Sequence, residues 1–268
     1  MSEFIYERSG DVYAPTEWAG SPWSRELQHG GPVCGLMARA AAEVERETGL
    51  RLVRLTVDLC RPTPRAPLLL ARRFLRQGRR LALVEIELRE GETVVTRGTA
   101  LLLAAQGDVT ATWRSDEPPP PGPAGLPVFH FMPRDYEAQV PPGFHRSLEV
   151  RFSEDELGPA LWVTTPLDLV AGEPTTPLLR AAMLSDLTFG LSGRLQLRRG
   201  QAPADPRAGA LINADVTLYL ERPPEGEWIA MRSGSISSVA GIGLAEVVQL
   251  DARGRYGRSL QALVSQRW

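Results

Sequence analysis

Residues 176–190 read Thr-Pro-Leu-Leu-Arg-Ala-Ala-Met-Leu-Ser-Asp-Leu-Thr-Phe-Gly, a stretch that predicts a helix with an acid near its end. Pro177 suits the first helical position, where its missing N–H costs nothing, and Thr176 before it is a suitable N-cap. Small and apolar residues fall on one stripe of this helix. Asp186 follows a run without another carboxylate, although the helix dipole favours acids at the opposite end. We therefore interpret Asp186 as a functional carboxylate.

The composition indicates a globular protein with a sizeable core. The chain has 268 residues, 43% of them hydrophobic and 23% charged, which suits one large domain or two ordinary ones. Its net charge of −2 gives no general attraction to nucleic acid or to an anionic membrane. The start is polar, without a signal-peptide core, and no apolar run is long enough to span a bilayer. We expect a cytoplasmic protein with no nucleic-acid or membrane partner.

The two cysteines give no sign of a metal site. Cys34 and Cys60 lie in apolar stretches and form no metal-binding pattern. Both are expected to be buried thiols in a reducing compartment.

The first half of the chain predicts one helix followed by an antiparallel meander. The helix opens at His29-Gly30-Gly31-Pro32, and the small and apolar residues that follow indicate a buried central helix. Beyond residue 49 the pattern alternates with a period of two, as in half-buried strands. The expected strands cover residues 53–59, 68–75, 81–88 and 93–104. A helix with such a meander is an α+β unit.

The second half repeats this pattern after a segment rich in proline and glycine. Strands are expected at 147–152 and 161–164, then the helix with Asp186, then strands at 210–220, 228–237, 241–250 and 257–266. Leu-Cys-Arg-Pro at 59–62 is answered by Leu-Glu-Arg-Pro at 220–223, and a repeat this long indicates a duplicated domain. We therefore divide the chain into an N-terminal domain (1–106), a Pro-rich linker (107–144) and a C-terminal domain (145–268).

Together these pieces resemble a tandem hotdog fold. A helix, a strand ending in Arg-Pro and a three-stranded meander occur twice, and the chain is similar to the double-hotdog acyl-CoA thioesterases of the thioesterase II type. The matching pieces are Gly30-Gly31, Ser-Asp-Leu-Thr-Phe at 185–189, Arg222-Pro223 and Gln261. The resemblance implies an α+β fold with two antiparallel sheets, each wrapped around a central helix. It also implies hydrolysis of an acyl-CoA to free acid and coenzyme A.

The resemblance further implies which residues act. In these enzymes a helix Asp, a Ser or Thr on the next strand and a late Gln hold the water that attacks the thioester. The Asp corresponds to Asp186 and the Gln to Gln261, whereas Asn213 occupies the hydroxyl position. Asn departs from the pattern, although its amide can still hydrogen-bond a water. No metal or redox cofactor is expected, since coenzyme A is part of the substrate.

The start of the first helix offers donors for the oxyanion. Backbone N–H groups at a helix N-terminus bind anions, with help from the helix dipole. His29, Gly30, Gly31 and Val33 supply this end, and Pro32 has no N–H. Gly31 and Val33 are therefore the expected donors. His29 is expected either to contact the substrate or to cap the helix.

The duplication provides an internal comparison. Alignment of the halves places Ala38 opposite Asp186, Leu52 opposite Asn213 and Gly98 opposite Gln261. The first half therefore lacks all three polar groups, as one active site per tandem pair requires. Open sheet edges and apolar faces favour association, so we expect a homodimer or a higher homo-oligomer.

Alternatives stay open for the residues and for the activity. Asp186 can bond its own backbone at a helix end, Gln261 can be an ordinary strand residue, and Asp215 is a rival acid. A hotdog hydratase or dehydratase acting on acyl-thioesters calls for a His paired with an acid, and His130 and His145, both near the linker, are not well placed. A non-catalytic acyl-CoA-binding or assembly module is the third alternative.

Overall fold

The computed structural model describes residues 4–105, 117–130, 132, 134–198, 200 and 211–265. The N-terminal half contains β1 (Phe4–Ser9), β2 (Val12–Pro15), the 3₁₀ helix η1 (Glu17–Ala19), α1 (Gly30–Thr48), β3 (Arg51–Asp58), β4 (Leu68–Gln77), β5 (Leu81–Glu90) and β6 (Thr93–Leu103). The rest contains α2 (Arg134–Glu137), the 3₁₀ helix η2 (Phe144–Ser147), β7 (Glu149–Asp155), β8 (Gly158–Thr164), β9 (Asp168–Val170), α3 (Pro177–Ser185), α4 (Thr188–Arg198), β10 (Leu211–Asn213), β11 (Asp215–Leu220), β12 (Ile229–Val239), β13 (Ile242–Asp251) and β14 (Gly254–Ser265). Residues 107–116 of the expected linker lie outside the described residues.

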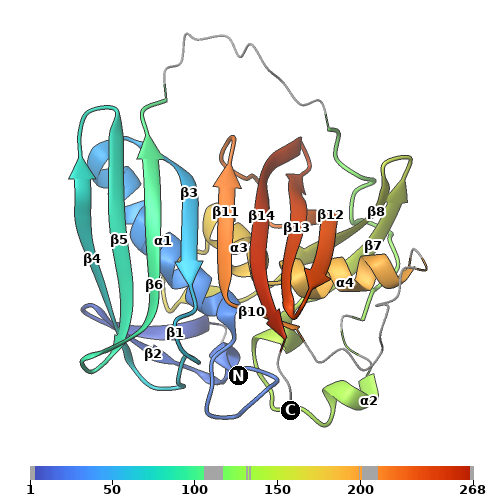
Figure 1. The fold of residues 1–268 in the computed structure, drawn as a ribbon, viewed down its shortest axis with the longest axis horizontal. Coiled ribbons are helices and arrows are strands. Elements are labelled where there is room, and N and C mark those ends of the chain that lie inside the picture. The colour runs from blue at the N-terminus through green and yellow to red at the C-terminus, as the bar shows by residue number, and fades with distance from the viewer. Residues whose placement is uncertain are drawn as a thin grey trace.

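The strands of the described residues form one continuous sheet. Its order is β7-β8-β12-β13-β14-β11-β3-β6-β5-β4-β2-β1-β9, and β10 pairs with β14 (Figure 1). The halves meet at the antiparallel pair β3–β11 and again where β1 runs parallel to β9. The tandem hotdog arrangement is consistent with this order, but the two expected antiparallel sheets are joined into one, because β3 and β11 pair edge to edge instead of each leaving a row of unpaired backbone groups.

The seam between β3 and β11 fixes how the two repeats correspond. Thr56 lies opposite Thr217 and accepts a hydrogen bond from its hydroxyl at 3.2 Å. The two strands correspond residue by residue outward from this pair. Leu52 then corresponds to Asn213, in agreement with the alignment made from the sequence.

Two other correspondences differ from the sequence alignment. In the neighbouring strands β6 and β14, the same register makes Ala100, not Gly98, the counterpart of Gln261. The sequence alignment placed Ala38 opposite Asp186. Counting the same number of residues from the two N-caps, His29 and Thr176, places Arg39 there instead. The first half still has no carboxylate or amide at these positions.

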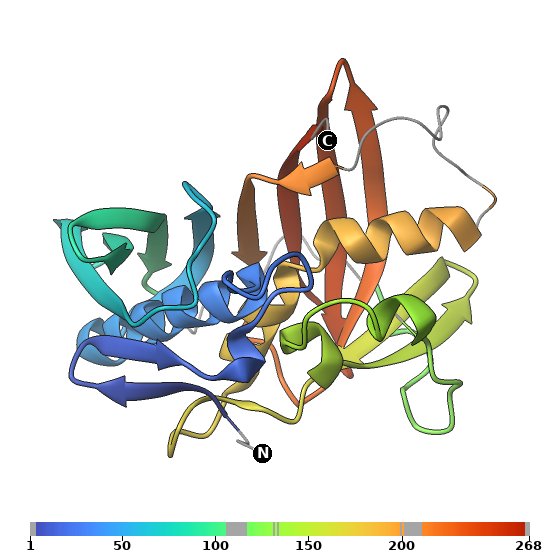
Figure 2. The same ribbon diagram turned by 90° about the horizontal axis from the view of Figure 1, so that it is seen from below.

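α1 is the central helix of the N-terminal half, as predicted. All of its residues from 31 to 41 are buried, and the N-terminal strands curve around it (Figure 2). It begins after the N-cap His29 and ends at Gly49, whose φ of 70° is a left-handed conformation that glycine adopts without strain.

α3 has the predicted start but a different end. The Thr176 side chain accepts a backbone hydrogen bond from the first turn, and Pro177 is the first helical residue. The helix stops with Asp186 as its C-cap instead of continuing through residue 190. A second helix, α4, then begins at Thr188 and packs on β12 and β13.

α1 and α3 approach each other closely between the two halves. A Cβ at Gly31 would lie 2.8 Å from the carbonyl oxygen of Met183, and one at Gly35 would lie 2.7 Å from its Cγ. Glycine at these positions removes the side chains that would hold the helices apart. The N-terminus of α1 therefore lies beside the C-terminal end of α3.

The expectation of two buried thiols holds only for one cysteine. Cys34 is buried in α1, whereas Cys60, just after β3, is exposed, and both are free. Within the described ranges, every helix is too short or too polar to cross a membrane.

Candidate active site

The Asp186 carboxylate brings together residues from both halves. Its side chain is only 7% exposed at the end of α3. Oδ1 accepts a hydrogen bond from Nδ2 of Asn213 at 2.9 Å, and Oδ2 lies 3.0 Å from Nδ1 of His29. Asn213 comes from the end of β10, and His29 from the N-cap of α1. Asp186, Asn213 and His29 are thus direct neighbours.

His29 faces two partners with one nitrogen. Its Nδ1 accepts a hydrogen bond from the backbone N–H of Gly31 at 3.1 Å and also lies against the Asp186 carboxylate. With a lone pair, Nδ1 can accept the hydrogen bond from the Gly31 N–H. With a proton, Nδ1 can instead donate to the Asp186 carboxylate. Whether Nδ1 carries a proton therefore decides whether His29 can accept the Gly31 N–H at the start of α1.

Gly30 lies directly against the carboxylate. A Cβ at this position would lie 2.6 Å from Oδ1 of Asp186, so a side chain here would displace the carboxylate. The N–H of Gly30 in the first turn of α1 meets no partner among the described residues.

Among the first four residues of α1, Gly30 is therefore the one whose N–H has no partner in the described part of the chain. The Gly31 N–H is bonded to His29, and Val33 is the fourth helical residue, whose N–H bonds the N-cap carbonyl by helix geometry. The assignment of Gly30, Gly31 and Val33 as oxyanion donors stays a prediction.

Gln261 contacts the backbone around Asp186 rather than its carboxylate. Nε2 donates to the carbonyl oxygen of Asp186 at 2.9 Å, and Oε1 accepts from the N–H of Phe189 at 2.8 Å. The end of α3 leaves carbonyl groups unpaired, and the start of α4 leaves N–H groups unpaired. The fully buried Gln261 satisfies one of each and so fixes the turn that presents the carboxylate.

A buried chain of hydrogen bonds continues from this turn. Thr188 donates to the carbonyl oxygen of Ser185 at 2.7 Å and accepts from the hydroxyl of Ser259 at 2.5 Å. Gln249 donates to Ser259 at 2.8 Å and accepts from Tyr256 at 2.6 Å. The sequence gives no signal for this network, because its members are distant in the chain.

The departure at Asn213 preserves one function of the expected hydroxyl. A Ser or Thr hydroxyl could donate to the carboxylate, and the Asn213 amide does so. Its amide oxygen remains as an acceptor, which a water can use.

The rival acid Asp215 already has partners in the sheet. Its Oδ1 accepts the N–H of Ala262 at 2.6 Å, and its Oδ2 accepts the Thr217 hydroxyl at 3.4 Å. Across the seam it faces Asp58, whose pKa is raised by burial and then by the charge of Asp215. These contacts assign Asp215 to the seam.

Two neighbours of the site come from η2. The Phe144 ring packs 5.3 Å from the His29 ring, measured between centroids. His145 is buried, and neither ring nitrogen has a partner in the described part of the chain. Burial lowers the pKa of His145 to about 4, and charge on His29 and Arg146 acts in the same direction. From the sequence, His145 is not assigned a role because it lies near the linker.

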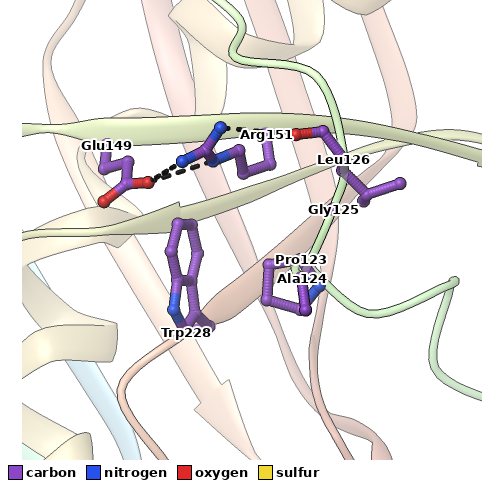
Figure 3. A pocket seen from close by; sticks show the side chains of 7 residues that line it. All are labelled: Pro123, Ala124, Gly125, Leu126, Glu149, Arg151 and Trp228. Atoms are coloured by element: carbon purple, nitrogen blue, oxygen red, sulfur yellow. Dashed lines mark hydrogen bonds and ion pairs between the residues drawn. The ribbon is translucent and has the colours of Figure 1, made fainter.

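A surface cavity lies away from these residues. It has a volume of about 320 Å³ and is flanked by Trp228 and by an ion pair between Arg151 and Glu149 (Figure 3). None of the predicted site residues lines it. Among the described residues, no group of three or more His, Cys, Asp or Glu side chains is arranged to hold a metal ion.

Comparison with known families identifies both halves. The acyl-CoA thioesterase N-terminal domain matches residues 19–103, and the acyl-CoA thioesterase C-terminal domain matches residues 114–264. Together with the fold, these matches define a thioester hydrolase of the double-hotdog class. The chain belongs to the acyl-CoA thioesterase family.

Solved structures share the hotdog fold at low sequence identity. A candidate thioesterase from Novosphingobium aromaticivorans is 21% identical, with a TM-score of 0.71, over 98% of this chain and 99% of the other. A protein of unknown function with a hot dog fold from Alicyclobacillus acidocaldarius is 17% identical, with a TM-score of 0.67, over 98% and 96%. An acyl-CoA thioesterase II from Mycobacterium marinum is 15% identical, with a TM-score of 0.64, over 98% and 96%. No curated protein matches the sequence.

Proposed function

We propose that this enzyme hydrolyses an acyl-CoA to free acid and coenzyme A, with Asp186 as the base that activates the attacking water. The observation that carries the proposal is the buried Asp186 carboxylate, held by Asn213 and His29 directly beside the unpaired N–H of Gly30. A base and an oxyanion donor at neighbouring positions are what acyl transfer to water requires.

In the proposed reaction, Asp186 takes a proton from water while the water oxygen attacks the thioester carbon. The carbonyl oxygen becomes negative, and the Gly30 N–H with the N-terminal end of α1 stabilises that charge. The C–S bond then breaks and the carbonyl re-forms. The departing thiolate takes the proton from Asp186, which leaves free acid, coenzyme A thiol and the original carboxylate.

His29 and Asn213 assist in different ways. Asn213 fixes one carboxylate oxygen through its N–H and offers its own amide oxygen to the water. His29 can share the proton that Asp186 acquires, because Nδ1 faces the carboxylate. Once Nδ1 carries a proton, it no longer accepts from Gly31, and that N–H becomes a second donor for the oxyanion.

The setting of the enzyme follows from this chemistry. Hydrolysis needs only water and proton transfers, so we propose no metal or redox cofactor. Free thiols are typical of a reducing compartment, and we place the enzyme in the cytoplasm, in lipid metabolism. We also propose that two or more chains associate through the open edge of β12, beside the exposed Val239 and Ile242.

The test is thiol release from a panel of acyl-CoAs by the wild type, Asp186→Asn and the control Asp11→Asn. Asp11 is an exposed turn residue, so its variant keeps the wild-type rate. Asp186→Asn is nearly isosteric but a poor base, and we expect kcat to fall by about 10³-fold. Equal rates for Asp186→Asn and the wild type would remove Asp186 from the reaction.

The same panel separates the rival functions. Tight binding of acyl-CoA without thiol release would identify a binding or assembly module. Addition or loss of water on the acyl chain, with the thioester intact, would identify a hydratase or dehydratase. Either result would overturn the proposed hydrolysis.

A further inference from the structure

His145 is a buried side chain without hydrogen-bond partners. It is 5% exposed, and both Nδ1 and Nε2 are unpaired within the described residues. Buried polar atoms are nearly always bonded, because an unpaired donor or acceptor loses its contact with water and gains nothing in return. An unpaired ring at this depth indicates a partner that is not among the described residues.

η2 is held rigidly beside the start of α1. The N–H of Phe144 donates to the carbonyl oxygen of Gly20 at 3.0 Å, and the N–H of His29 donates to that of Ala19 at 2.8 Å. Gly143 packs so tightly that a Cβ there would lie 2.0 Å from the same Gly20 oxygen. One turn of backbone, residues 19–20, therefore positions both η2 and His29.

The side chains of η2 form a wall next to the site. The Phe144 ring packs on His29, and a Cβ at Gly31 would lie 2.7 Å from Phe144 Cε1. The charge of His29 acts on His145, so the two imidazoles are near neighbours. His145 thus stands beside the residue that contacts Asp186.

A second unpaired donor lies in the same layer. The indole Nε1 of Trp18, in η1, is buried and has no partner among the described residues. η1 and η2 contact each other. The two contacting elements η1 and η2 therefore each carry a buried polar side chain whose partner is not among the described residues.

The ligand of His145 should be uncharged. The imidazole is neutral because burial lowers its pKa to about 4, and the charged groups that act on it, His29 and Arg146, are both basic. A neutral imidazole has one N–H donor and one lone pair. An amide offers the matching acceptor and donor, whereas a phosphate or carboxylate would favour a protonated ring.

We propose that His145 hydrogen-bonds an amide of the pantetheine arm of acyl-CoA. This arm is uncharged, carries amide groups and is joined directly to the thioester sulfur, so it passes beside the residues around the reacting carbon. The identity of the ligand rests on the proposed thioesterase function. His145 then selects the thiol half of the substrate, while Asp186 acts on the thioester.

The test compares His145→Phe and His145→Gln on an acyl-CoA and on the same acyl group esterified to ethanethiol, which has no amide. We expect His145→Phe to lower the ratio of kcat/KM between these substrates by about tenfold, mainly through KM. His145→Gln keeps a donor and an acceptor and should restore most of the ratio. The exposed His130, changed to Phe, is the matched control and leaves the ratio unchanged.

A binding measurement separates this proposal from the thioesterase proposal. Calorimetric titration of pantetheine into Asp186→Asn protein needs no turnover, and adding His145→Phe should weaken binding by about tenfold. If acyl-CoA is hydrolysed but His145→Phe changes neither the ratio nor pantetheine binding, the role of His145 is wrong. An equal loss on both thioesters would reduce His145 to a structural residue. If no acyl-CoA is hydrolysed, the thioesterase proposal fails, while the titration still decides whether His145 binds the arm.

Discussion

Nδ1 of His29 and Oδ2 of Asp186 lie 3.0 Å apart, although the two residues belong to different hotdog repeats. The contact joins the N-terminus of α1 to the C-terminal end of α3, so the site exists only when both halves are docked. Each half alone would present a helix end without its partner.

The first prediction concerns the coupling of these two residues. Because Nδ1 of His29 lies against the Asp186 carboxylate, their effects on the rate should not be additive. We expect His29→Gln to lower kcat by about 10–100-fold in the wild type and by less than about threefold in the Asp186→Asn background. Steady-state rates of the two single variants and the double variant measure the coupling. Additive losses would mean that His29 acts independently of Asp186.

The second prediction concerns the space beside the carboxylate. Gly30→Ala places a Cβ within 2.6 Å of Oδ1, so Asp186 must move. A displacement of this size costs about 10²-fold in kcat while the protein stays folded. Gly193→Ala in α4 is the matched control, because its Cβ meets no atom within 4 Å, and it should raise the free energy of unfolding by about 0.5–1 kcal/mol. A fully active Gly30→Ala enzyme would contradict the assigned geometry.

Much of this site could be predicted from the sequence, but the contacts within it could not. Asp186 is conspicuous because an apolar helix end gives no reason for an acid, whereas Asn213 is named only because the family resemblance places a Ser or Thr at its position. The role of Gly30 depends on a distance between two helices, which a single sequence does not contain. A choice of oxyanion donor among Gly30, Gly31 and Val33 depends on the structure, because it shows that the Gly31 N–H is already bonded to His29.

The fold, too, could be predicted only where local signals determine it. The helix starts and the meanders follow from local signals, namely caps and alternation, and the structure has them. The single sheet does not follow, because the pairing of β3 with β11 joins segments far apart in the chain. The expected helix over 176–190 does not include the break at Asp186 or the continuation of α4 to Arg198. Gly193 opposes a helix locally, whereas packing on β12 and β13 stabilises it.

The third prediction concerns Gln261 as the residue that holds the α3–α4 turn. Gln261→Leu leaves the carbonyl of Asp186 and the N–H of Phe189 unpaired in a buried place, which costs about 2–4 kcal/mol of stability. The turn loosens, and kcat should fall together with the midpoint of urea unfolding. Gln261→Glu, which keeps an acceptor for Phe189, should lose less stability than Gln261→Leu. Loss of activity at unchanged stability would instead favour direct contact of Gln261 with the water.

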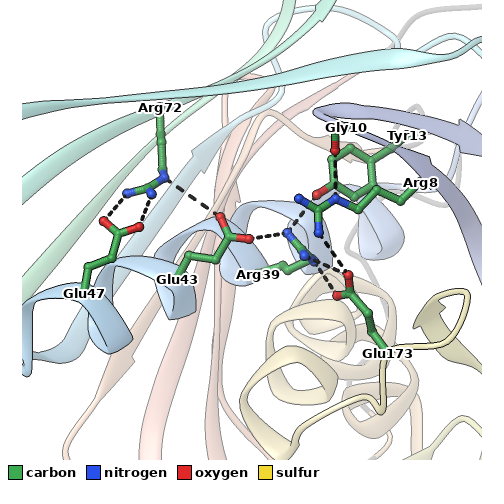
Figure 4. Close-up of polar contacts among 8 residues, drawn as sticks. All are labelled: Arg8, Gly10, Tyr13, Arg39, Glu43, Glu47, Arg72 and Glu173. Carbon is green, nitrogen blue, oxygen red and sulfur yellow. Dashed lines mark hydrogen bonds and ion pairs between the residues drawn. The ribbon is translucent and has the colours of Figure 1, made fainter.

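The fourth prediction concerns acid stability. Arg39 of α1 donates to Glu173 at 2.7 Å, and also to Glu43 and Tyr13 (Figure 4). The hydrogen bond from Arg39 lowers the pKa of Glu173 below its usual value of 4.5. This contribution to stability is therefore complete above that value and is lost as the pH falls through the lower, folded pKa.

Melting temperatures of the wild type and Glu173→Gln measure this effect. The wild type should melt higher near neutral pH, and the gap should close between about pH 5 and pH 3. Glu173 is partly exposed, so the gap will be small and will shrink in high salt. A gap that is constant across this range would mean that the charge of Glu173 contributes nothing.

The last prediction concerns association through β12. β8 pairs only with residues 229–232 of β12, so the rest of that strand is an open edge among the described strands. Val239 and Ile242 lie opposite each other near its tip and are 79% and 70% exposed. An uncharged edge with apolar side chains is suited to pair with a second copy. Ile242→Lys should therefore shift the protein to a smaller species in sedimentation velocity, while Leu157→Lys, at the turn between β7 and β8, should not. A wild type that sediments as a monomer at all concentrations would rule out this edge as an interface.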